Sequence, residues 1–141
     1  MSATIVPEEE MRAVAFSSLR YANGFYKTFH KSMNSEKSRF DQDLLFNFAV
    51  MSLEKYFVAL LARYDWNATH HMPVALFRES KPFETELTDT MKQTVILVGK
   101  FEAICSLDGF GYHTPTMEEL QQMVTGISEI KTLVEKRVAE L

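Results

Sequence analysis

The chain has 141 residues, a formal net charge of −4 and 46% hydrophobic residues. This length and balance predict one folded domain over residues 1–141 and exclude an intrinsically disordered chain. The acidic balance argues against a broad nucleic-acid-binding surface but is compatible with a local basic patch. The single cysteine, Cys105, excludes an internal disulfide and fits a reducing compartment.

The N-terminal stretch lacks a basic segment followed by an apolar core, which is the pattern of a signal peptide. No uncharged apolar run reaches the roughly 18 residues that are needed to cross a bilayer. We therefore expect a soluble, cytoplasmic protein with no membrane partner.

Apolar residues at helical spacing predict two long helices in the first half of the chain. The first is expected to begin at Pro7 and to continue to about Met33, with Gly24 interpreted as a close helix contact. The second is expected from about Asp41 to Tyr64 and is apolar on nearly all sides. Such a helix is either the central element of a bundle or is partly covered by a partner chain.

Three more helices are predicted in the second half. A short one should begin near His70 to Pro73 and end by Ser80, and a long one should cover about Glu84 to Leu107. Thr116, followed three residues later by Glu119, predicts a capping box at the start of the last long helix. With no alternating strand pattern, the chain is predicted to be all-α, an antiparallel bundle of four long helices plus one short helix.

A basic stretch, KTFHKSMNSEKSRF, covers residues 27–40 near the end of the first predicted helix. Lys27, His30 and Lys31 belong to it, and such a cluster could bind a phosphate group. The alternative is structural, because cations in the last turn of a helix also complement its dipole.

The stretch RYDWNATHH places six residues between Arg63 and the pair His70 and His71. Arginine can bind phosphate through two hydrogen bonds, and histidine can move a proton near neutral pH. Arg63 and His70 are therefore candidate catalytic residues for cleaving RNA, with His71 as a candidate ligand-binding residue.

The same stretch has a structural interpretation. Arg63 would cap the carbonyl end of its own helix, while Thr69 or a histidine ring would cap the start of the next helix. Tyr64 and Trp66 would then cover the end of the bundle. The adjacent histidines lack the helical spacing of metal ligands, so we expect no metal and no cofactor.

The order of these elements resembles the HEPN domains (higher eukaryotes and prokaryotes nucleotide-binding). The similarity rests on the apolar helix around residues 49–61, on Thr69-His70-His71-Met72, and on Tyr112 with Pro115-Thr116 and Glu119. It implies a homodimer that binds a nucleotide or RNA, often beside a minimal nucleotidyltransferase partner in a toxin–antitoxin or stress system.

The segment GFGYHTPT, residues 109–116, departs from the ribonuclease members of this family, because no arginine stands at the required distance from His113. Tyr112 and His113 are nevertheless candidate ligand-binding residues if the ends of two helices bring them toward His70. A different possibility is a non-catalytic helical module that binds another protein. A metal-independent ribonuclease that uses Arg63 and His70 is the second alternative.

Overall fold

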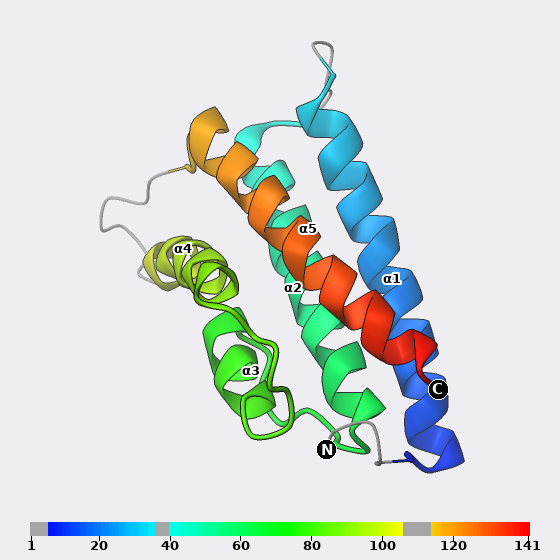
Figure 1. Cartoon of the computed structure of the whole chain (residues 1–141). Helices are drawn as coiled ribbons and strands as arrows, with labels where there is room; N and C mark the ends of the chain where they lie inside the picture. The colour runs from blue at the N-terminus through cyan, green and yellow to red at the C-terminus, as the bar shows by residue number, and fades with distance from the viewer. Residues whose placement is uncertain (1–5, 36–39, 106–113) are drawn as a thin grey trace.

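The computed structural model describes residues 6–35, 40–105 and 114–141, and within these ranges the chain forms five α-helices and no strand (Figure 1). The predicted all-helical fold is thereby confirmed. The helices in chain order are α1 (Glu9–Met33), α2 (Gln42–Arg63), α3 (Pro73–Ser80), α4 (Asp89–Cys105) and α5 (Met117–Ala139).

The helices α1, α2 and α5 lie side by side, with α1 running in one direction and α2 and α5 returning in the other (Figure 1). Helix α2 contacts all four other helices and is therefore the central element, which is the first of the two alternatives expected for it. Its buried residues come from most of its circumference, as its composition requires. They include Leu45, Phe46, Ala49, Leu53, Tyr56, Phe57, Leu60 and Leu61.

Helices α3 and α4 pack beside this group, where α4 contacts α3 and α5 and touches α2 only slightly. Figure 1 shows α4 nearly end-on, so its axis lies steeply across those of α2 and α5, the two long helices that it contacts. Gly126 of α5 lies at this crossing, and a Cβ added to it would stand 1.9 Å from Oγ1 of Thr94. The close helix contact is therefore at Gly126. The interpretation of Gly24 is wrong, because a Cβ there would meet nothing within 4 Å.

Two predicted helix starts are wrong. Helix α1 begins at Glu9, because Pro7 precedes an extended Glu8 whose backbone N–H donates to Asp65. Helix α4 begins at Asp89 rather than Glu84. The hydroxyl of Thr88 accepts a hydrogen bond from the backbone N–H of Met91, which is the bond that an N-cap side chain makes.

Two other predicted ends are confirmed. Helix α3 spans Pro73 to Ser80, with the proline in its first turn. At the start of α5 both hydrogen bonds of the capping box are present between Thr116 and Glu119. The predicted end of α4 at Leu107 lies outside the described residues.

One described helix, α2, is long and apolar enough to cross a membrane by length and composition. Of its most apolar stretch, 56% is buried against the other helices, and the core helix of a soluble protein passes the same test.

Candidate functional site

Arg63 is a buried residue at the end of α2, with 2% of its surface exposed. Its Nε donates to the carbonyl of Arg137 at 2.9 Å, and its Nη2 lies 3.3 Å from a carboxylate oxygen of Glu140. Arg63 thus binds the carbonyl end of α5, whereas the structural interpretation expected it to cap α2. In this position its guanidinium is closed to a phosphate from solvent.

A buried ionic network continues from this point toward α4. Nε and Nη2 of Arg137 donate to the two carboxylate oxygens of Glu84 at 2.8 and 3.0 Å, and the Tyr64 hydroxyl donates to Glu84 at 2.6 Å. Burial raises the pKa of Glu84, but the hydrogen bonds from Arg137 and Tyr64 outweigh it and hold that pKa below its usual range. The network joins α2, α5 and the segment before α4.

The loop between α2 and α3 is organised around the carboxylate of Glu79. This carboxylate accepts hydrogen bonds from Nε1 of Trp66 at 2.8 Å, from both the backbone N–H and the hydroxyl of Thr69 at 2.9 Å, and from the His70 ring at 3.0 Å. The α3 N-cap, Met72, has no side-chain capping bond. The expectation that Thr69 or a histidine caps α3 is therefore wrong, since these groups hold the far end of α3 instead.

Tyr64 and Trp66 both pack against Phe83, and their ring centroids lie 6.0 and 5.2 Å, respectively, from that of Phe83. The expectation that they cover this end of the molecule is confirmed. His70 lies on Glu79 with 55% of its side chain exposed, and His71 is 88% exposed, 3.9 Å from Glu54. The partners that place Arg63 lie on α5 and those that place His70 lie on α3, so no partner shown for either residue brings the two together.

We expect Glu79→Gln to lower the free energy of unfolding by about 1–2 kcal/mol at pH 7. Burial raises the pKa of Glu79, but its hydrogen bonds from Trp66, His70 and Thr69 lower that pKa from 4.5 to about 2. A carboxyl group with a lowered pKa stabilises the fold above its unfolded pKa and loses this effect as the pH falls through its folded pKa.

Urea unfolding of the parent and the variant at pH 7 and near pH 2 measures this effect. The difference in unfolding free energy should shrink between about pH 4.5 and pH 2. Glu118→Gln, at an exposed carboxylate, is the matched control and should change little at either pH. An equal loss at both pH values for Glu79→Gln would contradict the assignment.

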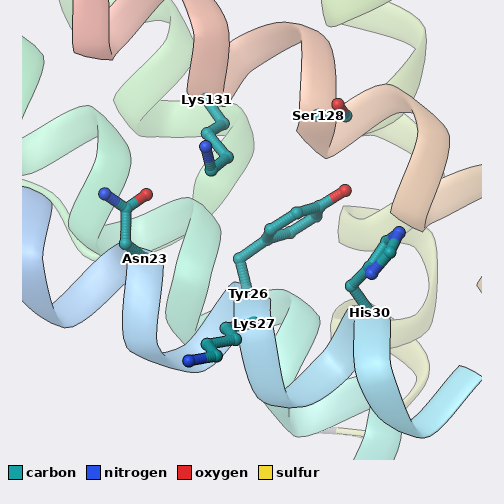
Figure 2. Close-up of a pocket in the computed structure, with 6 residues that line it drawn as sticks. All are labelled: Asn23, Tyr26, Lys27, His30, Ser128 and Lys131. Atoms are coloured by element: carbon teal, nitrogen blue, oxygen red, sulfur yellow. The ribbon is translucent and has the colours of Figure 1, made fainter.

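A shallow groove lies between α1 and α5 (Figure 2). Its volume is about 470 Å³, and it is lined by Asn23, Tyr26, Lys27, His30, Ser128 and Lys131. Figure 2 shows Tyr26 lying between Lys131 and His30, with Lys131 reaching down from α5 and Lys27 at the α1 side. We call it the α1–α5 groove. It combines two ammonium groups, an imidazole and an exposed serine hydroxyl.

Internal hydrogen bonds fix the floor of the α1–α5 groove. The hydroxyl of Tyr26 donates to the carbonyl of Val124 at 3.1 Å, and the hydroxyl of Tyr56 donates to Oδ1 of Asn23 at 2.7 Å. Burial and the nearby Glu135 carboxylate raise the pKa of Tyr56, so its hydroxyl stays protonated and remains a donor. The floor is therefore buried and hydrogen-bonded, while the cations at its rim are exposed or partly exposed.

Charge in the α1–α5 groove is partly balanced. Nζ of Lys131 lies 2.8 Å from Glu135, and the amide of Asn23 donates to the same carboxylate at 3.4 Å. Lys27 forms no ion pair with any residue that the structure describes. The His30 ring is exposed, and its centroid lies 5.8 Å from that of Tyr26. An incoming anion would therefore meet one free ammonium and a second that it shares with Glu135.

The structure thus brings two members of the predicted basic cluster, Lys27 and His30, together with Lys131. Lys31 is exposed and does not line the α1–α5 groove. Sequence reasoning missed Lys131, because nothing in the local pattern of α5 links it to a residue about a hundred positions earlier. The candidates Tyr112 and His113 lie outside the described residues.

Among the side chains that the structure describes, no group of three or more histidine, cysteine, aspartate or glutamate residues is placed to hold a metal ion. Comparison of the chain with models of known protein families, with curated proteins and with solved structures finds no match.

Proposed function

We propose that this helical protein binds the phosphate groups of a nucleotide or of RNA in the α1–α5 groove. The observation that carries the proposal is the meeting of Lys27 and His30 of α1 with Lys131 of α5 around one groove of about 470 Å³. That volume lies within the usual range for small-molecule sites. Ammonium groups attract phosphate, and an exposed imidazole ring beside them offers a face on which a base can stack.

Binding without cleavage is the form of the proposal that the geometry favours. Cleavage by Arg63 and His70 would require an arginine that reaches the scissile phosphate, and Arg63 is held inside the molecule by the end of α5. The ribonuclease alternative predicts that RNA is cut by the parent protein and by neither Arg63→Ala nor His70→Ala. The binding proposal predicts that RNA stays intact on a denaturing gel.

The double variant Lys27→Glu/Lys131→Glu is expected to weaken binding of fluorescein-labelled oligouridine by at least about tenfold, because phosphate contacts supply most of the affinity of such sites. Fluorescence anisotropy at several salt concentrations measures this, and the salt dependence should fall by about one unit of slope for each lost contact. Lys31→Glu is the matched control, since Lys31 is on the same helix but outside the groove.

Glu135→Gln should act in the opposite direction, because it removes the carboxylate that competes for Lys131. Tighter oligouridine binding by this variant would support the proposal. If the parent and all three variants bind oligouridine equally, or if none of them binds it, the α1–α5 groove is not a phosphate-binding site. That result would favour the alternative, a non-catalytic module that binds another protein.

We further propose that the five helices form a HEPN-like domain, in which α1 runs antiparallel to α2 and α5 while α4 lies across them, and that the protein is a cytoplasmic homodimer. The support for a dimer is on α2, where the apolar side chains of Leu44 and Met51, two turns apart on one face, leave 39% and 37% of their surfaces exposed. Met51→Glu should convert a dimer to a monomer in sedimentation velocity, and Gln121→Glu, at an exposed position on the side of α5 that faces α4, is the control. A monomeric parent protein would contradict this.

The resemblance to HEPN domains also leads us to propose a minimal nucleotidyltransferase partner in a toxin–antitoxin or stress system. Native mass spectrometry of the complex isolated from its own host tests this. A nucleotidyltransferase chain in a fixed ratio is the expected result, and a species that contains this chain alone contradicts it.

A further inference from the structure

A second cleft lies between α3 and α4, and we call it the α3–α4 cleft. Its volume is about 170 Å³ and it is more enclosed than the α1–α5 groove. Four apolar side chains form its walls and floor, namely Val74, Phe77, Val95 and Ile96. Phe77 and Val95 are almost fully buried, whereas Ile96 leaves 43% of its surface in solvent. The cleft is therefore an apolar site with one exposed apolar edge.

Three cations surround this apolar cleft. Arg78 and Lys81 come from α3 and its end, and Lys92 comes from α4. None of the three forms an ion pair with any residue that the structure describes, and Lys81 lies over the Phe77 ring at 5.9 Å. Lys100 follows Lys92 and Ile96 at intervals of four residues, so it lies on the same face of α4. A chain with a net charge of −4 thus presents a cationic face here.

The size of the α3–α4 cleft limits what it can hold. Cavities that take a whole small ligand usually measure about 300–1,000 Å³. An apolar cavity of about 150 Å³ holds a single benzene ring. At about 170 Å³ the cleft matches one large apolar side chain, and the cations around it remain available to groups on either side of that anchor.

We propose that the α3–α4 cleft is a docking site for an acidic segment of a partner protein. One large apolar side chain of the segment enters the cleft between Phe77 and Ile96. Aspartate or glutamate residues on both sides of this anchor pair with Arg78, Lys81 and Lys92. The apolar anchor supplies affinity, and the charges orient the segment and accelerate its association.

The site is separate from the α1–α5 groove, because the two share no lining residue. Helix α4 packs on α5, but α1 makes no contact with α3 or α4 among the described residues. Variants of one site should therefore leave the other unchanged. The phosphate-binding proposal and the docking proposal can fail separately.

Selection of peptides from a displayed random library on the immobilised full chain tests the proposal. Enriched peptides should carry one aromatic or large aliphatic residue flanked by acidic residues. In fluorescence anisotropy, Lys92→Glu and Ile96→Asp should each weaken the best peptide by at least about tenfold. Arg20→Glu, an exposed charge reversal on α1, is the matched control and should bind normally. Circular dichroism confirms that each variant remains helical.

Three results would overturn the proposal. The first is a selection that enriches no peptides, or peptides without acidic residues. The second is peptide binding that Lys92→Glu and Ile96→Asp leave unchanged. The third is binding to phosphatidylserine vesicles or to oligouridine that depends on Lys92 and Ile96 in the absence of peptide binding, which would assign the cationic face to a lipid surface or to RNA.

Discussion

Arg137→Met is expected to lower the free energy of unfolding by about 3–5 kcal/mol, because it leaves the Glu84 carboxylate buried without its cation. Arg137 and Glu84 are 5% and 2% exposed. Two hydrogen bonds, at 2.8 and 3.0 Å, join them. The hydroxyl of Tyr64 and the backbone N–H of Glu86 would still donate to Glu84, but neither neutralises its charge. Urea unfolding monitored by circular dichroism at pH 7 measures the loss.

The double variant Glu84→Leu/Arg137→Met should be more stable than Arg137→Met alone, since no buried charge is left unpaired. The partly exposed pair Lys131–Glu135 is the control, and Lys131→Met should cost at most about 1 kcal/mol. A loss for Arg137→Met as small as that for Lys131→Met would mean that the network around Glu84 does not hold α2, α5 and the segment before α4 together.

Gly126→Ala is expected to destabilise the protein by about 1–3 kcal/mol, because the new Cβ would overlap the side chain of Thr94. The added atom would stand 1.9 Å from Oγ1 of Thr94 and 2.8 Å from its Cβ, so moving the hydroxyl alone does not relieve the overlap. Helix α4 would have to move away from α5 at their crossing. The unfolding midpoint in urea measures the effect.

Gly24→Ala is the matched control on α1, where an added Cβ meets nothing within 4 Å. It should stabilise the protein by up to about 1 kcal/mol, because alanine favours the helix more than glycine does. Gly99→Ala should fall between the two, since its Cβ would meet only the end of the Val74 side chain at 2.8 Å. A Gly126→Ala variant as stable as the parent would contradict the close approach of α4 and α5.

Sequence reasoning located the helices well wherever the signal was local. The Thr116 and Glu119 capping box and the short helix behind Pro73 depend on neighbouring residues, and both are present. The start of α4 is predicted too early, because an acidic residue such as Glu84 is typical of the first turn of a helix. In the structure Glu84 precedes the helix and pairs with Arg137, fifty-three positions later. The contact of Gly126 with Thr94 joins two different helices, so the sequence of neither helix predicts it.

The candidate site was harder to predict for the same physical reason. RYDWNATHH has the residue types of an active site, yet two of its side chains form hydrogen bonds with groups outside the stretch, which no local pattern predicts. Arg63 binds the end of α5, and His70 binds Glu79. The α1–α5 groove needs Lys131 beside Lys27, and only the packing of α5 on α1 brings them together.

The most direct test of phosphate binding in the α1–α5 groove is a titration of uniformly ¹⁵N-labelled protein with ATP, followed by the amide resonances. Our account predicts saturable shifts for amides around Lys27 and His30 on α1 and around Ser128 and Lys131 on α5, with those of Thr69 to His71 unmoved. Shifts confined to Thr69 to His71 would instead support a binding site in the loop that follows α2. An unchanged spectrum would contradict nucleotide binding.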